Sequence, residues 1–484
     1  MENIKKINDI LVNLFNMVLK MEEKSIKDST RHDLSITELH TLVAIGDGRP
    51  KTMTQVASIL KVNVSTLTVA INRLVKKGYA DRFRIPEDRR IVKIRLTEEG
   101  VSAVKEHEAF HMEMISEAIA QIPKDEIEPF IESIDKINQY VVDRKHPPAK
   151  VAGPFKLSPI QMGQQTVPVP IIQGALSVGL SKSRLAAAVA KEGGLGIIAT
   201  SKIGYGEEDF ITNPLAANKR VLTEELKKAF SLVKDCQKRG PIGVNIMLSA
   251  EHWSEYVKTA VEAGAEVIVC GAGIPTTLPY YCKDKKVALV PIIASKRAAG
   301  IIVKNWAKKY NRTPDGFIFQ GPMAGGYLGY KESQLEAAQE DFYNTIADIK
   351  GEIEDLNNCP LIVAGGIYTR EDGEKAYAYG ADGLQMGTRF VTTKECDASG
   401  KYKEAYLNCK ENDVTIITSP EGFPGRIIKN DYSKKIDGDP KCITQGLINA
   451  AKGNLKEGLV FCGAKVSKAK KLEEVGDIFK EFTK

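Results

Sequence analysis

The segments Pro360-Leu-Ile-Val-Ala-Gly-Gly-Ile367 and Ala381-Asp-Gly-Leu-Gln-Met-Gly-Thr-Arg-Phe390 decide the fold of the larger part of the chain, and a helical spacer separates them. Each is a short apolar run that ends in small residues, which is typical of a buried parallel strand. In a (β/α)8 barrel, the loops after the last two strands commonly bind phosphate, because glycine lets backbone N–H groups approach an anion. The residues that suit such a cradle are Gly365, Gly366, Gly387 and Thr388. The alternative is an ordinary turn of another α/β enzyme.

Strand-like apolar runs alternate with helical patterns throughout residues 155–484. They are Val169–Gln173, Gly196–Ala199, Ile242–Met247, Val267–Cys270, Leu289–Ile293, Gly316–Phe319, Leu361–Ala364 and Gly383–Met386. Regular alternation of this kind implies βαβ units and a parallel sheet. Eight strands suit a closed TIM (β/α)8 barrel, in which the active site lies at the C-terminal ends of the strands.

Composition is ordinary for a globular protein of two to four domains, with 43% hydrophobic and 27% charged residues and a net charge of +6. No apolar run is long enough to suggest a membrane span, and the first residues lack a signal pattern, so we expect a cytoplasmic protein. All eight cysteines lie at or after Cys236 without a Cys-x-x-Cys pair, and His252 is the only histidine beyond residue 150. We therefore expect no metal site.

Residues 1–143 predict a separate, mainly helical domain with a small β-wing. Ser35 and Glu38 have the spacing of a capping box at the start of one helix. Two short helical patterns then follow and end at Gly78, which predicts a helix-turn-helix. Two strands around the turn at 86–90 complete a winged helix. Amphipathic patterns at 4–23 and 101–142 suggest a homodimer interface, and the polar, Pro-containing segment 144–154 reads as a linker to the barrel domain, 155–484.

Positive charge concentrates on the helix-turn-helix and its wing. The residues are Lys61, Arg73, Lys76, Lys77, Arg82, Arg84, Arg89, Arg90, Lys93 and Arg95, against only Asp81, Glu87 and Asp88. This footprint predicts a double-stranded DNA operator as partner. The candidate DNA-binding residues are Ser65, Thr66, Thr68 and Asn72, which can reach base edges, with Arg73, Arg84, Arg89 and Arg90. The alternative is an interaction module with a solvated basic face.

The wing tip Asp88-Arg89-Arg90, followed by Leu96-Thr97-Glu98-Glu99-Gly100, resembles the MarR family of winged-helix regulators. Within that family, the sequence is most similar to the regulators of bacterial fatty-acid synthesis genes. That narrower resemblance is carried by Leu34-Ser35, Glu38-Leu39-His40-Thr41, Val75-Lys76-Lys77-Gly78-Tyr79 and the wing. It covers about residues 1–140 and implies a dimeric DNA-binding domain.

The barrel segment resembles the nitronate monooxygenase family, once called 2-nitropropane dioxygenases, which is related to the flavin-dependent type II enoyl-ACP reductases. The matching motifs are Pro170-Ile-Ile-Gln-Gly174, Lys191-Glu-Gly-Gly-Leu-Gly196, Gly243-Val-Asn-Ile-Met247, Gly271-Ala-Gly-Ile-Pro275, Gly321-Pro-Met-Ala-Gly-Gly326, Ala364-Gly-Gly-Ile367, Gln385-Met-Gly-Thr-Arg-Phe390 and Glu395-Cys-Asp397. They occur in the family's order, and jointly they are highly specific.

This resemblance implies one FMN across the C-terminal mouth of the barrel. Its phosphate would be held by Gly325, Gly326, Gly365, Gly366, Gly387 and Thr388. The ring and ribityl chain would be addressed by Gln173, Asn245 and Gln385, with Gly174 and Met386 beside them. In the family a nitronate reduces the flavin and oxygen reoxidises it, whereas the reductase relatives pass a hydride from NAD(P)H to an enoyl thioester. Either a nitronate or an acyl thioester is therefore the expected substrate.

The sequence departs from the family at the residue that follows the Gly325-Gly326 pair. The family usually has His there as acid or base, and this chain has Tyr327; Gln320 stands where the related enzymes commonly have Glu. A phenol, with a pKa of about 10, is a poor base at neutral pH but can still donate a proton or a hydrogen bond. The candidate catalytic residues are thus Tyr327, Gln320 and, as the remaining histidine of the domain, His252. Some relatives also carry a cysteine cluster near residues 424–448; only Cys442 lies there, so we expect no iron–sulfur cluster.

These observations leave three functional hypotheses open. The first is a working flavoenzyme fused to a DNA-binding transcriptional regulator. The second is a regulator of lipid metabolism whose barrel senses flavin redox state or an acyl ligand and has lost the usual His chemistry. The third is a pair of domains joined only for co-expression.

Overall fold

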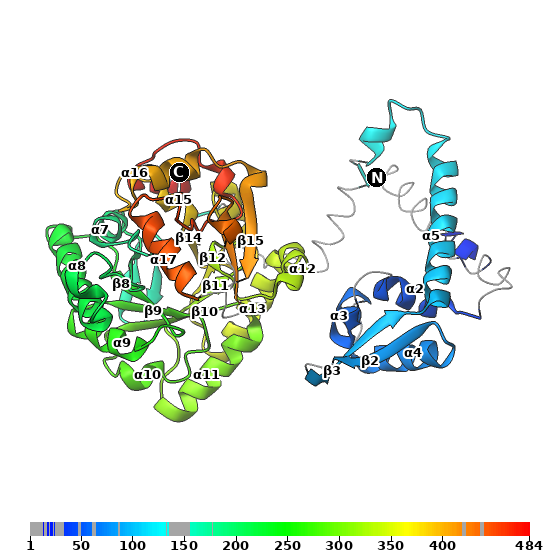
Figure 1. The fold of residues 1–484 in the computed structure, drawn as a ribbon, viewed down its shortest axis with the longest axis horizontal. Helices are drawn as coiled ribbons and strands as arrows, with labels where there is room; N and C mark the ends of the chain where they lie inside the picture. The colour runs from blue at the N-terminus through cyan, green and yellow to red at the C-terminus, as the bar shows by residue number, and fades with distance from the viewer. Residues whose placement is uncertain are drawn as a thin grey trace. The chain divides into compact units, whose positions relative to one another are not determined.

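The structure is a computed structural model with two compact units, Met1–Gln139 and Tyr140–Lys484 (Figure 1). It describes residues 33–46, 50–60, 64–85, 88–131, 133–134, 155–176, 178–418, 423–435 and 440–484, together with 13, 17–18, 20–22 and 24. Most of the predicted helix at 4–23 and all of the linker at 144–154 lie outside the described residues. The domain boundaries at 143 and 155 therefore stay predictions.

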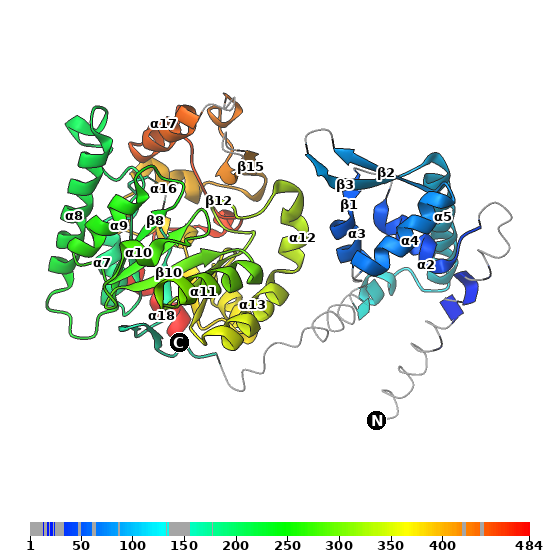
Figure 2. The ribbon, with the colours of Figure 1, turned by 90° about the horizontal axis from the view of Figure 1, so that it is seen from below.

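The N-terminal unit is a winged helix, as predicted (Figure 2). Its elements are α2 (Ile36–Ile45), β1 (Lys51–Thr52), α3 (Met53–Leu60), α4 (Val64–Lys76), β2 (Ala80–Ile85), β3 (Asp88–Leu96) and α5 (Glu98–Ile119). The three strands form one antiparallel sheet in the order β1-β3-β2. Leu42, Ile71, Leu74 and Ile94 are fully buried between the sheet and the helices, so an apolar core fixes α4 on its scaffold.

Local sequence signals set the ends of these helices. The capping box at α2 is confirmed: the Glu38 amide donates to Ser35 Oγ at 3.3 Å, and the Ser35 amide donates to the Glu38 carboxylate at 2.9 Å. After α4, Gly78 has φ +83°, a left-handed conformation that favours glycine. Gly100, in the first turn of α5, is required for a different reason. A Cβ there would lie 2.1 Å from the Tyr79 carbonyl oxygen.

The C-terminal unit is a closed eight-stranded parallel barrel, which confirms the predicted TIM fold (Figure 1). Its strands are β6 (Ile171–Gln173), β7 (Gly196–Ala199), β8 (Ile242–Met247), β9 (Val267–Gly271), β10 (Ala288–Ile293), β11 (Phe317–Gln320), β13 (Leu361–Ala364) and β14 (Gly383–Met386). From β7 to β14 each barrel strand pairs with the next along the chain, β14 pairs with β6, and an isolated bridge between Ile172 and Leu195 joins β6 to the segment before β7. Backbone bonds of 3.1 Å from Gln173 to Leu195 and from Leu195 to Ile171 close the ring beside β7.

Side chains fill the barrel and leave only one end for a ligand. Apolar residues such as Ile172, Val290 and Ile362 are fully buried inside it. The hairpin of β4 (Ile160–Met162) and β5 (Gln165–Val167) adds Met162 and Val167 to this cluster. The hairpin contacts the segments that precede β10 and β11 and therefore covers the N-terminal end of the barrel. A ligand of this fold must then bind at the opposite, C-terminal rim.

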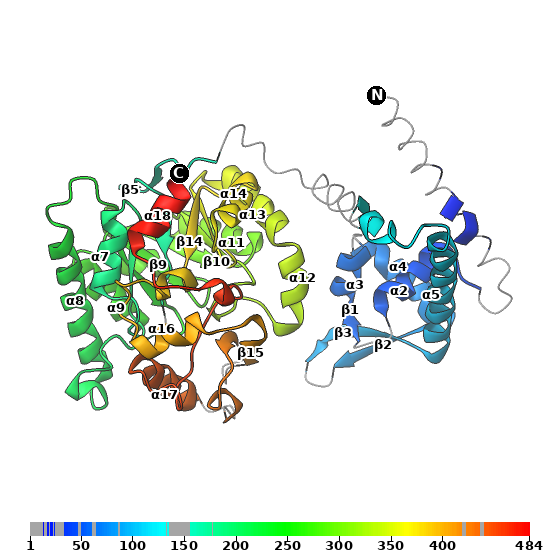
Figure 3. The same ribbon diagram turned by 90° about the horizontal axis from the view of Figure 1, so that it is seen from above.

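Helices surround the barrel, and a second sheet lies at its rim (Figures 2 and 3). The helices are α7 (Ser183–Lys191), α8 (Pro214–Val233), α9 (Trp253–Glu262), α10 (Leu278–Tyr281), α11 (Lys296–Tyr310), α12 (Leu335–Glu340), α13 (Phe342–Leu356), α14 (Arg370–Ala378), α15 (Thr388–Val391), α16 (Gly400–Leu407), α17 (Pro440–Ala451) and α18 (Val475–Thr483). The antiparallel sheet has the order β12 (Gly326–Tyr327), β16 (Pro424–Ile428), β15 (Val414–Thr418), and the sequence did not predict it. Among the described helices, none combines the length and apolar character needed to cross a membrane.

Candidate active site and nucleic-acid interface

The loops after β13 and β14 present unpaired backbone donors at the rim of the barrel. Gly365 and Gly366 have φ values of +85° and +100°, which few residues other than glycine adopt. The N–H groups of Gly365, Gly366 and Gly387 donate no hydrogen bond to another described residue. Backbone donors left over at strand ends form a concave site for an anion. This geometry suits an anion such as a phosphate, and the rim loops that form it are called the cradle below.

The rim glycines divide into two groups by the space around them. A Cβ on Gly365 would lie 2.7 Å from the Gly321 carbonyl oxygen, and one on Gly325 would lie 2.8 Å from the backbone of Cys462. These glycines let the rim loops pack together. In contrast, a Cβ on Gly326 would meet no atom within 4 Å, and one on Gly387 would meet only Leu176 Cδ2 at 3.6 Å. The open space beside the second group is room for a ligand.

Two residues that the sequence did not single out as ligands complete the cradle. The Gly463 amide donates to Thr388 Oγ1 at 2.9 Å, which leaves the Thr388 hydroxyl proton for a further acceptor. Arg426, on β16, is buried and donates through Nη1 to the carbonyl of Pro322 at 2.9 Å and to that of Ala324. It forms no ion pair with a described carboxylate, and burial lowers its pKa. A buried cation without a protein anion suits a site for a negatively charged ligand.

The predicted catalytic residues are only partly brought together. Gln320 ends β11, and its Nε2 donates to the carbonyl of Tyr327 at 3.3 Å. The Tyr327 ring lies 5.3 Å from Phe461 and 6.3 Å from Phe423, between ring centroids. His252 precedes α9, is about half exposed and pairs with Glu251 at 3.3 Å. No hydrogen bond or ion pair among the described residues connects His252 with Gln320 or Tyr327, so its catalytic role stays a prediction without support from this geometry.

Of the remaining predicted flavin ligands, Gln173 ends β6, Gln385 and Met386 are the last two residues of β14, and Asn245 lies within β8. Gln173 is fully buried; its Nε2 donates to the Gly174 carbonyl, and its Oε1 accepts from the Ile197 amide at 3.0 Å. Its carboxamide therefore joins β6 to β7. Asn245 and Gln385 are half-buried, and Met386 is buried. Gly174 lies beside Gln385, whose Nε2 would be 3.0 Å from a Cβ at that position.

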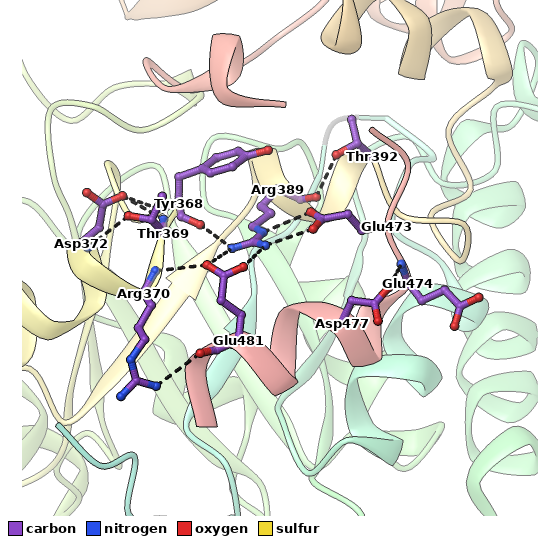
Figure 4. Close-up of polar contacts among 10 residues, drawn as sticks. All are labelled: Tyr368, Thr369, Arg370, Asp372, Arg389, Thr392, Glu473, Glu474, Asp477 and Glu481. Carbon is purple, nitrogen blue, oxygen red and sulfur yellow. Dashed lines mark hydrogen bonds and ion pairs between the residues drawn. The ribbon is translucent and has the colours of Figure 1, made fainter. Parts of the chain in front are cut away.

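A buried arginine holds the rim to the C-terminal helix (Figure 4). Arg389, in α15, pairs with Glu473 at 3.1 Å and with Glu481 at 2.5 Å, and donates to the Tyr368 carbonyl at 2.8 Å. Its side chain is 5% exposed. The bond from Arg389 lowers the pKa of Glu481. Since Arg389 directly follows Thr388, this clamp fixes the position of the cradle.

The recognition helix α4 presents a polar face opposite its buried residues Leu67, Ile71 and Leu74. The exposed residues on it include Thr66, Asn72, Arg73 and Lys76, and Thr68 is half-buried. Four of the predicted DNA-binding residues, Thr66, Thr68, Asn72 and Arg73, are therefore at least partly accessible to a ligand. The side chains of Ser65, Arg84, Arg89 and Arg90 lie outside what the structure describes, so their contribution stays a prediction.

Comparison with known families agrees with this division of the chain. The family model of nitronate monooxygenase matches residues 159–484, and that of the MarR family matches residues 34–92. A curated relative from Rhodococcus jostii, (3aS,4S,5R,7aS)-5-hydroxy-7a-methyl-1-oxo-octahydro-1H-indene-4-carboxyl-CoA dehydrogenase, is 25% identical over 293 residues, 60% of this chain and 71% of the relative.

Two solved structures resemble the two units. FabK from Thermotoga maritima is 26% identical, with a TM-score of 0.51 over 65% of this chain and 92% of that chain. FabT from Streptococcus pneumoniae, solved in complex with DNA, is 34% identical and matches 29% of this chain and 98% of that chain, with a TM-score of 0.28.

Proposed function

Since the chain belongs to the nitronate monooxygenase family through residues 159–484 and carries a MarR domain in front of that segment, we propose that it is an FMN-dependent oxidoreductase fused to a DNA-binding regulator. The observation that carries the proposal is the rim cradle. The N–H groups of Gly365, Gly366 and Gly387 have no acceptor there in the part of the chain that the structure describes, and open space lies beside Gly326 and Gly387. FMN, when bound, supplies the reversible electron transfer that such an enzyme needs.

Each part of the rim then has a proposed role toward the cofactor and substrate. The three glycine amides and the Thr388 hydroxyl hold the phosphate, and Arg426 provides a compensating positive charge. Tyr327 donates a hydrogen bond to the anionic group of the substrate, and Gln320 fixes the backbone of Tyr327. The rings of Phe423 and Phe461 give the site an apolar side, which suits an aliphatic nitronate or the acyl chain of a thioester.

Two substrate classes are compatible with this site, and the relatives point to both. The family is named for nitronate monooxygenation, and the relative from Rhodococcus jostii is named for a CoA thioester. An anaerobic titration of the FMN-loaded protein distinguishes them. If the protein oxidises nitronates, the nitronate of nitroethane is expected to reduce the flavin directly and bleach its visible absorbance. If it is a reductase, NAD(P)H is expected to reduce the flavin, and crotonyl-CoA is then expected to reoxidise it. A flavin that stays oxidised with both donors would exclude turnover of either kind.

A sensory role is the second candidate, and one observation favours it. The barrel has no histidine at the position that follows Gly326, and His252 is engaged with Glu251. We propose in this case that the redox state of the flavin or an acyl ligand changes the affinity for DNA, a coupling that must be reciprocal. DNA binding by oxidised, reduced and flavin-free protein tests this role, and three equal affinities would contradict it.

We propose that the N-terminal unit binds a double-stranded DNA operator as part of a homodimer, which places the chain in the cytoplasm. Arg73 is exposed on the polar face of α4 and suits a phosphate contact. The variant Arg73→Ala is expected to weaken binding to all DNA sequences. It is also expected to reduce the slope of log affinity against log salt concentration by about one, since each phosphate contact releases about one counterion. Fluorescence anisotropy of labelled DNA at several salt concentrations measures the affinity and its dependence on salt. Lys105→Ala, on the exposed side of α5, is the matched control, and equal losses in both variants would contradict the assignment.

A further inference from the structure

Half of the six histidines of the chain gather around one buried carboxylate in the N-terminal unit. His107 and His111 are one helical turn apart on α5, and His40 lies on α2. Glu22 lies in the helical stretch 20–22 and is 5% exposed. Three separate segments of the chain therefore converge on one point.

One donor atom each of Glu22, His107 and His111 lies within 4.8 Å of the other two, a spacing that a single metal ion can span, and His40 lies beside this set. His111 Nε2 is 2.9 Å from Glu22 Oε1, and His40 Nε2 is 3.8 Å from Glu22 Oε2. His107 Nε2 is 3.2 Å from His111 Nε2. The ring centroids of His40 and His107 are 5.7 Å apart. Tetrahedral zinc has bonds of about 2.1 Å, which place neighbouring donor atoms roughly 3.4 Å apart. The three distances between donor atoms, 2.9, 3.2 and 3.8 Å, lie on both sides of that value.

The burial of Glu22 supports a ligand more than a purely structural role. No Lys or Arg among the described residues forms an ion pair with Glu22; its recorded partners are His40 and His111. An isolated buried carboxylate is costly unless a cation neutralises it. His40 and His111 face Glu22 through their Nε2 atoms, and Nε2 of His107 lies 3.2 Å from that of His111. One divalent cation between them would satisfy all these groups.

We propose that Glu22, His107 and His111 bind one divalent transition-metal ion, that the ion is Zn²⁺, and that the neighbouring His40 turns towards the ion as its fourth ligand. Three imidazoles and one carboxylate form a four-coordinate set that zinc accepts without a geometric penalty. The site does not depend on the flavin proposal, because all four residues belong to the N-terminal unit. From the sequence we expected no metal site, because the cysteines form no Cys-x-x-Cys pair and the barrel segment has a single histidine. That expectation did not take into account the four-residue spacing of His107 and His111.

The ion also joins parts of the DNA-binding scaffold. α5 carries two ligands and α2 carries one, and α2 is the helix that packs against both α3 and α4. Removing the ion is therefore expected to lower the thermal stability of the N-terminal unit as well as its metal content. This stability effect gives a readout that does not require enzymatic activity.

The test uses the full-length protein, purified without a metal-affinity tag and dialysed against zinc-free buffer. Mass spectrometry of the metal content is expected to find about one zinc ion per chain. Replacing that zinc with Co²⁺ is expected to give the visible bands of tetrahedral cobalt in a difference spectrum against the zinc form, which cancels flavin absorbance. The variants His107→Asn and His111→Gln are expected to lose the bands and to weaken zinc binding by at least about tenfold, since even outer-shell changes cost that much.

His252→Asn is the matched control, because this exposed histidine lies in the other unit. It is expected to keep the metal and the cobalt spectrum. Circular dichroism and FMN binding verify that each variant is folded. Wild-type protein that retains no zinc and gives no tetrahedral cobalt bands would overturn the proposal. So would folded His107→Asn protein that retains zinc with wild-type affinity, because the metal would then lie elsewhere.

Discussion

Replacing Gly387 with valine is expected to weaken FMN binding by about ten- to a hundredfold while leaving the barrel folded. The backbone there has φ −111°, which valine can adopt, and a new Cβ would meet only Leu176 at an ordinary distance of 3.6 Å. The side chain would instead occupy space beside a free N–H group. A hydrogen bond to a charged phosphate contributes about 1.5–3 kcal/mol, which corresponds to this loss of affinity.

Fluorescence quenching of FMN measures the affinity, and the matched control is Gly351→Val. A new Cβ on Gly351 would likewise meet no close neighbour, with nothing within 4 Å, but Gly351 lies on α13, away from the rim. The control is expected to bind FMN as the wild type does. If Gly387→Val retains wild-type affinity, the phosphate does not lie against this loop.

Replacing Arg389 with methionine is expected to lower the free energy of unfolding of the barrel by about 3 kcal/mol. The substitution keeps much of the side-chain volume but leaves Glu473, whose side chain is 12% exposed, without its cation. Removing one partner of a buried ion pair costs about 3–5 kcal/mol, and the lower figure applies because the Glu481 side chain is 40% exposed. Urea unfolding of the FMN-free protein, followed by barrel tryptophan fluorescence, measures the change.

Arg220→Met provides a control of the same chemistry at the surface. Arg220 pairs with Asp209 at 2.6 Å and Glu207 at 2.9 Å, but its side chain is 43% exposed. Water screens ion pairs between exposed side chains, so they contribute little, and this variant is expected to change the free energy of unfolding far less than Arg389→Met. Equal losses in both variants would show that burial does not determine the strength of the Arg389 clamp.

The Arg389 clamp also predicts a direction of pH dependence. The folded protein holds the pKa of Glu481 below its ordinary value of 4.5. The stabilisation is therefore complete above the pKa of the unfolded chain and is lost as pH falls through the lower pKa of the folded state. The difference in stability between wild type and Arg389→Met is expected to narrow on acidification. A difference that widens at low pH would contradict this assignment.

The barrel strands were predictable because buried parallel strands are apolar and end at small or polar residues. The boundaries of β7, β8, β13 and β14 agree with the sequence-based ranges, and the capping box at Ser35 is where its spacing indicated. These signals are local: they depend on a few consecutive residues. The order of eight such units along the chain then determined the topology.

The missed features depend on contacts between distant residues. β12 pairs with β16 across about a hundred positions, and both strands are too short to give a periodic pattern. The role of Arg426 depends on the same pairing, and the role of Gly463 depends on a second long-range contact, its hydrogen bond to Thr388. Gly463 did carry a weak signal, since a small residue ends the apolar run 459–462. The His107–His111 spacing was a visible signal too, but His40 and Glu22 join it only through the packing of the helices.

The pairing of the first barrel strand with the last affects how the chain folds while it is being synthesised. β6 needs β14 as a neighbour, and Arg389 needs Glu473 and Glu481 from a segment translated still later. On the ribosome, the winged-helix unit is complete long before these residues emerge. Nascent chains must therefore pass through a stage with a finished N-terminal unit and an open, apolar half-barrel, which is a surface that molecular chaperones recognise.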